Sequence, residues 1–194
     1  MIAALLLAAG SSRRFGAPKL LQPSRGKAIV RWSAEAALAG ADALYVVVPT
    51  DHAELRSALA GLDVCFVVNG RAADGMGSSL ACGVGAVGPD AEAILVALAD
   101  EPQLPADAYQ RVVATYREGG NDIVAATYQG QRGHPVLFDR MVFPELAALS
   151  GDHGARSVVD RIPGRVAFVE FDAPHPVDVD TPADLARILD GSHL

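Results

Sequence analysis

The sequence predicts an α/β fold, specifically a single Rossmann-like, three-layer domain with a mostly parallel central sheet. Short β-rich runs alternate with helical patterns, and this order builds a parallel sheet that helices cover on both faces. Several of the runs are apolar throughout, as strands buried on both sides are. The 194 residues contain no internal repeat, low-complexity tract or linker, so residues 1–194 are expected to form one domain.

Seven apolar or β-rich segments are expected to be strands. In chain order they are Ile2–Ala8, Ala43–Val48, Val64–Val68, Ala93–Leu98, Asp122–Ala126, Pro135–Phe138 and Val166–Phe171. Ligands of open α/β sheets bind beyond the carboxyl ends of the strands. The segments that follow these strands are therefore where a binding site is expected.

Helices are expected between the strands. The segment Pro105–Glu118 has apolar side chains at the helical spacing i, i+3, i+4, i+7, and two glycines follow it. The last helix has the clearest start, with Thr181 as N-cap, Pro182 at the first helical position and Asp184 at N3 in an approximate capping box. The other expected helices are Ala28–Ala39, Ala53–Leu59 and a glycine-diluted segment, Gly75–Gly88.

Composition narrows the range of functions. Sixteen basic and 23 acidic side chains give a formal charge of −7, which argues against a general nucleic-acid or anionic-membrane binder but allows a small phosphorylated ligand. No run approaches the ~18 apolar residues of a membrane span. The apolar start lacks the basic region of a signal peptide, so a cytoplasmic location is expected. Cys65 and Cys82 are expected to be reduced core residues, because they lack the spacing of a disulfide framework or metal cluster.

The loop after the first strand, Leu7–Lys19, has the makings of a phosphate site. Its small residues and two glycines allow backbone N–H groups to approach an anion. Arg13 can clamp phosphate oxygens and Lys19 offers a flexible charge, whereas Arg14 is expected to point away. The loop matches neither the G-x-G-x-x-G fingerprint nor a P-loop. An ordinary surface turn with solvated arginines remains the alternative.

A second glycine-rich segment follows the third strand. Asn69 and the run Gly75-Met76-Gly77-Ser78-Ser79-Leu80 offer backbone donors, hydroxyl groups and a helix N-terminus. From these residues alone, a flexible turn before a serine-capped helix is the favoured interpretation.

Carboxylates follow the fourth strand and precede the last helix. The expected strand Ala93–Leu98 is followed by Ala99 and then by Asp100 and Glu101. Before the last helix, residue alternation along an extended stretch puts Asp178 and Asp180 on the same face. Mg²⁺ is usually held by one or two carboxylates together with substrate phosphates. The alternative is that these residues only end a strand, make a turn or cap a helix. The sequence does not show whether Glu101 ligates, faces solvent or affects the substrate.

Two polar segments lie further along the chain. Arg132–Phe138 includes His134, and Ser150–Arg156 includes Asp152 and Arg156. Basic groups near a helix start would suit a phosphate-bearing second substrate. Equally, His134 could be a satisfied histidine at a strand edge and Arg156 a solvated helix residue.

Taken together, these motifs resemble a known family. L-A-A-G-x-S-x-R-x-G-x-x-K at Leu7–Lys19 resembles the signature loop of nucleotidyltransferases that activate sugars, isoprenoid precursors and molybdopterin, with Phe15 where methionine is commoner. In chain order, the segments G-M-G-x-S-L, Asp-x-Pro, R-G-H-P-x-L-F, G-D-x-G-A-R and D-x-D-T-P-x-D-L resemble the molybdenum cofactor cytidylyltransferases among the MobA-like nucleotidyltransferases. Within Asp-x-Pro, Glu101 stands where close relatives often have an apolar residue. A nucleotide-diphospho-sugar transferase-like fold is expected.

The resemblance implies roles for particular residues. Leu7, Ala8, Ala9 and Gly10 would contact the nucleotide through their backbone, with Arg13 and Lys19 on its phosphates. Nucleobase and ribose would lie against Asn69, Gly75, Gly77, Ser78 and Ser79. Asp100 would bind Mg²⁺, with Asp180 favoured slightly over Asp178 as the second ligand. Arg13, Lys19 and Asp100 would be catalytic. The acceptor would contact His134, Asp152 and Arg156.

The implied reaction is transfer of CMP from CTP to molybdopterin with release of pyrophosphate. Ala9-Gly10, in place of the Gly-Gly of guanylyltransferase relatives, favours CTP. The alternatives are a guanylyl- or adenylyltransferase acting on molybdopterin or a sugar phosphate, and a non-catalytic nucleotide-binding protein for molybdoenzyme maturation. Transient contact with a molybdoenzyme or its chaperone is also expected, but not with nucleic acid or membrane. An oxidoreductase is disfavoured because the dinucleotide fingerprint is missing.

Overall fold

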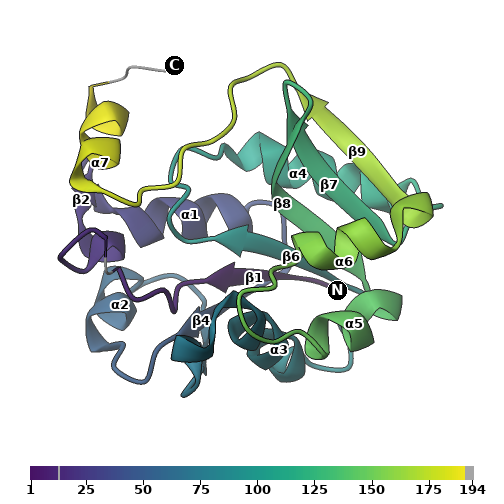
Figure 1. The fold of residues 1–194 in the computed structure, drawn as a ribbon, viewed down its shortest axis with the longest axis horizontal. Helices are drawn as coiled ribbons and strands as arrows, with labels where there is room; N and C mark the ends of the chain where they lie inside the picture. The colour runs from purple at the N-terminus through teal and green to yellow at the C-terminus, as the bar shows by residue number, and fades with distance from the viewer. Residues whose placement is uncertain (13, 191–194) are drawn as a thin grey trace.

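A seven-stranded sheet forms the centre of the molecule in the computed structural model, which describes residues 1–12 and 14–190 (Figure 1). The strand order is β5-β4-β1-β6-β8-β7-β9. The strands are β1 (Ile2–Leu7), β4 (Ala43–Val48), β5 (Cys65–Val68), β6 (Ala93–Leu98), β7 (Ile123–Tyr128), β8 (Gln131–Asp139) and β9 (Val166–Phe171), and β2 (Pro23–Ser24) and β3 (Lys27–Ala28) make a separate hairpin.

The sheet is mostly parallel, as predicted. Only β8 runs antiparallel to its two neighbours, β6 and β7. The two residues that join β7 to β8, Gln129 and Gly130, both have positive φ values, 50° and 77°. A two-residue turn with this backbone joins antiparallel strands into a hairpin. The pairing also lengthens β8 well beyond the predicted Pro135–Phe138, because its first residues pair with β7.

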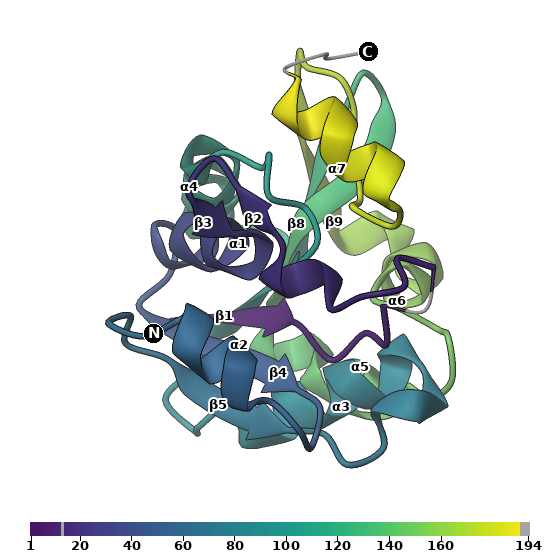
Figure 2. The same ribbon diagram turned by 90° about the vertical axis from the view of Figure 1, so that its left-hand side faces the viewer.

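Helices cover both faces of the sheet, so the predicted three layers are present (Figures 1 and 2). One core contains side chains of α1 (Ile29–Leu38), α2 (Ala53–Ala58), α4 (Ala106–Arg117) and α7 (Pro182–Leu189). The other contains side chains of α3 (Met76–Ala86), α5 (Phe143–Ala147) and α6 (Arg156–Arg161). Strand β1 serves both cores through alternation: Leu6 faces the first and Leu5 the second, and each is 0% exposed.

The predicted helices are confirmed within one or two residues at each end, including the glycine-diluted one, which is α3. The start of α7 is the capping box that the sequence indicates. The Thr181 hydroxyl accepts a hydrogen bond from the backbone N–H of Asp184, and the Asp184 carboxylate accepts one from the backbone N–H of Thr181. The short helices α5 and α6 were not predicted, because five or six residues carry little periodicity.

The carboxyl ends of three neighbouring strands meet at one edge of the sheet. Leu7 at the end of β1 lies opposite Val47 of β4 and Leu98 of β6. The backbone N–H of Ala8 still bonds Val47, and that of Ala99 still bonds Leu7. The loops after β1, β4 and β6 therefore begin side by side. Among the described residues, no helix is both long and apolar enough to cross a bilayer.

The close contact of α3 with β1 gives a test of the core. A Cβ added at Gly83 would come within 2.4 Å of the buried Leu5 side chain, whereas one at Gly85 in the same helix would meet nothing within 4 Å. We expect Gly83→Ala to lower the free energy of unfolding by about 1–3 kcal/mol through overpacking. Gly85→Ala should raise it by up to about 1 kcal/mol, since alanine favours helices. Urea unfolding measures both, and equal effects would contradict this packing.

Candidate functional site

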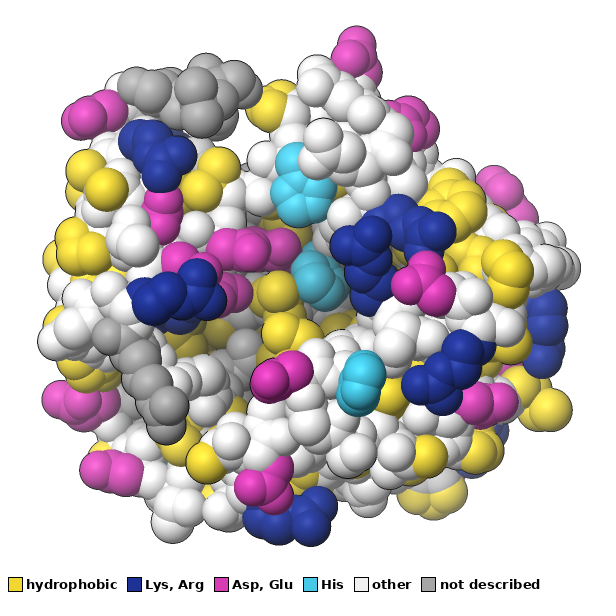
Figure 3. All heavy atoms as spheres, in the orientation of Figure 1, with side chains coloured by type: hydrophobic (Ala, Val, Ile, Leu, Met, Phe, Trp, Pro, Cys, Tyr) yellow, Lys and Arg dark blue, Asp and Glu magenta, His cyan; other side chains and the backbone are white. Residues whose placement is uncertain are grey.

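A large cavity opens at the edge where β1, β4 and β6 end. Its volume is about 1340 Å³, and the loop after β1 forms one wall and the segment after β4 another. In the space-filling view, acidic side chains gather in a hollow, with basic side chains on one side of them and histidines on the other (Figure 3). The cavity lining includes these residues that the sequence singles out: Leu7, Ala8, Ala9, Gly10, Lys19, Gly75, Ser79, Asp100, Asp152, Asp178 and Asp180.

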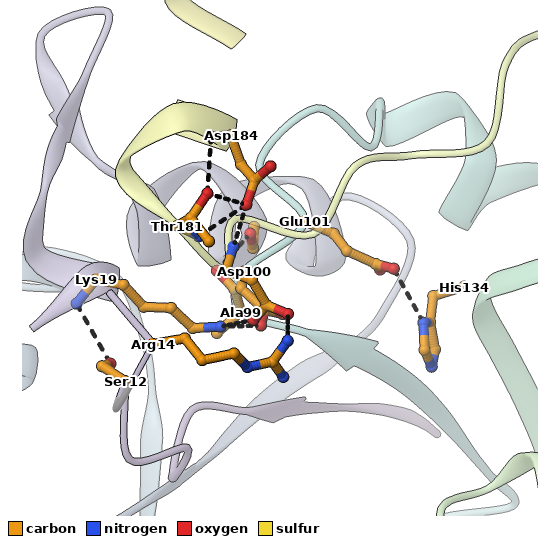
Figure 4. A network of polar contacts seen from close by, with 11 residues as sticks. Ser12, Arg14, Lys19, Ala99, Asp100, Glu101, His134, Thr181 and Asp184 are labelled. Atoms are coloured by element: carbon orange, nitrogen blue, oxygen red, sulfur yellow. Dashed lines mark hydrogen bonds and ion pairs between the residues drawn. The ribbon is translucent and has the colours of Figure 1, made fainter. Parts of the chain in front are cut away.

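The Lys19 ammonium joins two carboxylates from distant parts of the chain. Its Nζ lies 2.6 Å from Oδ2 of Asp100 and 3.0 Å from Oδ1 of Asp180 (Figure 4). The Lys19 side chain is only 10% exposed. Burial by itself opposes the charged form, but Asp100 and Asp180 outweigh it and raise the pKa of Lys19 above its ordinary value. Lys19 is therefore a fixed cation between two anions.

Backbone contacts hold the two acidic segments together. The N–H of Val179 donates to the carbonyl oxygen of Asp100 at 2.9 Å, and the Val179 side chain is fully buried. Alternation then turns Asp178 and Asp180 toward the cavity, as predicted from the sequence. The capping box at Thr181 fixes the point at which α7 begins. This geometry brings Asp180 to Lys19.

Arg14 corrects one expectation. It was predicted to point away from the site, but its guanidinium lies 2.8 Å from Oδ2 of Asp180, while most of its side chain is exposed. The prediction was wrong because Asp180, which is distant in sequence, supplies an acidic partner. Arg13 lies outside the described residues, so its phosphate role rests on the sequence.

Glu101 is buried and faces away from Lys19. Its side chain is 2% exposed, and Oε1 lies 3.2 Å from Nδ1 of His134 on β8. Burial lowers the pKa of His134, but the Glu101 carboxylate outweighs this effect, so the pKa is raised above its ordinary value. Of the three options that the sequence left open for Glu101, the structure excludes exposure to solvent.

Asp178 belongs to the Glu101 side of the site. Partial burial, followed by the charges of Glu101 and Asp100, raises the pKa of Asp178 to about 7. A protonated Asp178 can donate a hydrogen bond to Glu101, whose Oε2 atom has no hydrogen-bond partner among the described residues. Asp180, in contrast, shares Lys19 with Asp100. The two aspartates that the sequence could not distinguish thus have different surroundings.

Asn69 and Ser78 are buried within their own segment. The Asn69 amide donates to the hydroxyl groups of Ser78 and Ser79, and its oxygen accepts the backbone N–H of Arg71. The Ser78 hydroxyl donates toward the carbonyl oxygens of Arg71 and Gly75. Of the three polar side chains, only Ser79 is in the cavity lining. These bonds show how the segment keeps its shape, and direct contact of Asn69 or Ser78 with a nucleotide remains a prediction.

The two glycines of the G-M-G run allow a close crossing of two loops. Gly75 has φ of 102°, and a Cβ there would come within 2.4 Å of the Gly151 carbonyl oxygen. A Cβ at Gly77 would come within 2.8 Å of the Ser150 backbone, and the Gly77 N–H donates to Gly151 at 2.8 Å. The proposed nucleotide and acceptor segments are therefore in contact. The close approach of these two loops therefore accounts for glycine at both positions.

Of the three residues expected on the acceptor side, one lines the cavity. Asp152 is exposed and lines the cavity. Arg156 is exposed at the start of α6 and, like His134 and Gly77, is not in the lining of this cavity. The His134 ring is 21% exposed, and its backbone oxygen accepts a 2.7 Å hydrogen bond from the Tyr128 hydroxyl. The structure brings Asp152 to the cavity and leaves His134 and Arg156 outside its lining.

The Asp100–Asp180 pair suits a hard divalent cation that also binds substrate phosphates. The two carboxylates approach one point, which Lys19 Nζ occupies. Among the described residues, no cluster of three or more His, Cys, Asp or Glu side chains could hold a metal without further ligands. Mg²⁺ is commonly held in this way, by one or two carboxylates with water and phosphate oxygens completing the shell. The residues thus fit a metal that arrives with a nucleotide.

Comparison with known proteins identifies a matching family and two similar proteins. The model of the MobA-like NTP transferase domain matches residues 4–166. Nicotine blue oxidoreductase of Paenarthrobacter nicotinovorans is 35% identical, with 97% of this chain and 96% of that protein covered. Purine catabolism protein PucB of Bacillus subtilis is 32% identical, with 93% and 92% covered.

Solved structures agree with this result. The crystal structure of Rv0371C from Mycobacterium tuberculosis in complex with manganese is 30% identical, covers 98% of this chain and 99% of that chain, and has a TM-score of 0.78. A nucleotidyl transferase from a species of Methanothermobacter is 25% identical, covers 98% and 97%, and has a TM-score of 0.84. The predicted fold class is therefore confirmed, and a divalent metal is bound by one relative.

The position of Lys19 predicts competition with a divalent cation. A unit charge about 4 Å away contributes about 4 kcal/mol at an effective permittivity of 20, and solvent and rearrangement offset most of it. We expect Lys19→Gln to tighten Mn²⁺ binding to the nucleotide-free protein about tenfold, which equals about 1.4 kcal/mol. Electron paramagnetic resonance measures free Mn²⁺. Lys27→Gln, which removes one of the two basic partners of Glu35 instead, is the control. Unchanged or weaker Mn²⁺ binding in Lys19→Gln would contradict the geometry.

Proposed function

Since this chain belongs to the MobA-like NTP transferase family, we propose that it is a Mg²⁺-dependent enzyme that transfers CMP from CTP to molybdopterin and releases pyrophosphate. The observation that carries the proposal is the meeting of Lys19, Asp100 and Asp180 at the cavity edge. One cation and two carboxylates in that place suit the triphosphate and its metal. The acceptor rests on the sequence motifs around His134 and Asp152.

In the proposed reaction, an oxygen of the molybdopterin phosphate attacks the α-phosphorus of CTP. The bond between the α-phosphorus and the bridging oxygen to the β-phosphate breaks, and pyrophosphate leaves with that oxygen. The attacking phosphate is already ionised at neutral pH, so the protein needs no general base. Alignment and neutralisation of charge are what such a transfer requires from the protein.

Different residues of the chain would align the substrates and neutralise their charge. The backbone of Leu7–Gly10 would contact the nucleotide and the Lys19 ammonium would bind its phosphates, with Arg13 beside Lys19 on the strength of the sequence. Asp100 and Asp180 would hold Mg²⁺, and Asp178, which lies with Glu101, is set aside as a ligand. When bound, Mg²⁺ would neutralise charge on the phosphate oxygens. Once Lys19 has moved to the phosphates, both carboxylates are free for the metal.

The choice of CTP over GTP and ATP depends on Ala9-Gly10.

The chain covers most of a relative named nicotine blue oxidoreductase, so oxidoreduction is the second candidate function. Against it stands the first loop, which lacks the dinucleotide fingerprint. A non-catalytic nucleotide-binding protein for molybdoenzyme maturation would bind CTP without turnover.

The test is pyrophosphate release from CTP, GTP or ATP in Mg²⁺, with and without molybdopterin. We expect release with CTP only when molybdopterin is present. Asp100→Asn should slow it at least about a hundredfold, the scale on which lost charge stabilisation acts. Asp107→Asn, at an exposed position on α4, should leave it unchanged and serves as the control.

Other outcomes separate the alternatives. Release with GTP or ATP would overturn the base and keep the reaction class. Nucleotide binding without release, whichever acceptor is supplied, would favour the accessory protein. Oxidation of NADH or NADPH with a quinonoid dye, together with no release, would favour the oxidoreductase.

A further inference from the structure

Asp100 and Glu101 are consecutive residues that serve opposite sides of the site. The Asp100 carboxylate binds Lys19, which comes from the loop after β1, and the Glu101 carboxylate extends the other way to His134 on β8 (Figure 4). One side corresponds to the proposed nucleotide and the other to the proposed acceptor. The loop after β6 is thus the structural link between the two half-sites.

The burial of Glu101 calls for a physical reason. A carboxylate that is 2% exposed loses nearly all contact with water, and this is costly unless partners replace the solvent. The observed partner is the His134 ring, at 3.2 Å, and the second carboxylate oxygen has no hydrogen-bond partner among the described residues. Apolar residues of similar volume often replace a buried ion pair without loss of stability, so the pair of Glu101 and His134 points to a role in the site.

The pair sets the orientation of the His134 ring. An ionised carboxylate can only accept hydrogen bonds, so Nδ1 of His134 must carry the proton that Glu101 accepts. The Tyr128 hydroxyl fixes the backbone of the same residue through its 2.7 Å bond to the His134 oxygen. Figure 4 shows the other ring nitrogen turned away from Glu101. The ring is 21% exposed, so it can be reached from outside.

We propose that Glu101 is a positioning residue for the acceptor: it holds His134 so that Nε2–H donates a hydrogen bond to the phosphate of the second substrate. This inference rests on the proposed function, because that function supplies a phosphate-bearing acceptor. In the cationic ring both nitrogens carry protons, so that Nδ1–H donates to Glu101 and Nε2–H donates to an oxygen of the phosphate monoester. Glu101 acts through His134 and does not touch the acceptor.

Three variants test the inference by steady-state kinetics. Glu101→Met fills the space and removes the acceptor of the Nδ1 proton, so KM for molybdopterin should rise about tenfold, the lower end of the effect of losing a group that orients a metal-bound histidine. KM for CTP should not change. Glu101→Gln keeps an accepting oxygen at Oε1 and should restore most of the loss. His134→Ala should raise the same KM.

The double variant separates positioning from a general structural role. If Glu101 acts through His134, Glu101→Met with His134→Ala should be no worse than His134→Ala alone. Additive losses, or an unchanged KM for molybdopterin in Glu101→Met, would overturn the inference. Inactivity of the wild-type protein with every acceptor would instead count against the proposed function.

A direct readout covers the case in which Glu101→Met does not fold or no turnover is found. Nitrogen-15 NMR of the wild-type histidine rings should show His134 protonated at Nδ1, and phenyl phosphate should shift its Nε2 signal. Glu101→Gln should retain the shift and His134→Ala should identify the signal by its loss. An Nδ1 without a proton, or an Nε2 signal that phenyl phosphate leaves unmoved, would contradict the proposal.

Discussion

The ion-pair cluster of Lys19, Asp100 and Asp180 is the interaction on which the arrangement of the site depends. Its members come from the loop after β1, the loop after β6 and the stretch before α7. Two carboxylates this close repel each other unless a cation lies between them. The lysine supplies that cation and ties the C-terminal segment to the edge of the sheet. A metal with bound phosphates can take over the same role, and for this reason we propose the cluster as a nucleotide site and not only a structural tie.

Much of the fold could be predicted because the sheet is largely parallel. Its strands are apolar on both faces, so β1, β4 and β6 stand out in the sequence. The capping box of α7 is local and was equally visible. The direction of β8 was not predicted, since it depends on the positive φ values of Gln129 and Gly130. The first residues of β8 are polar and exposed, and so they lack the apolar pattern of a buried strand.

The site was predicted in part, and the failures share a physical cause. Residues near the ends of β1 and β6 could be identified because parallel strands end at one edge. Contacts between distant segments could not: Arg14 reaches Asp180, and Glu101 pairs with His134. A carboxylate beside Asp100 was visible in the sequence, but only the antiparallel course of β8 places a histidine against it. The internal bonds of Asn69 likewise depend on a folded turn.

A crystal structure with Mn²⁺ and a non-hydrolysable CTP analogue tests the proposed site most directly. Manganese has an anomalous signal that places the ion without reference to the surrounding ligands. We expect one ion at about 2.0–2.3 Å from carboxylate oxygens of both Asp100 and Asp180, from the Mg²⁺ distances to the lower end of the Ca²⁺ distances. Lys19 should then have moved from the carboxylates to a phosphate oxygen. An ion bound elsewhere, with Lys19 still between the two aspartates, would contradict it.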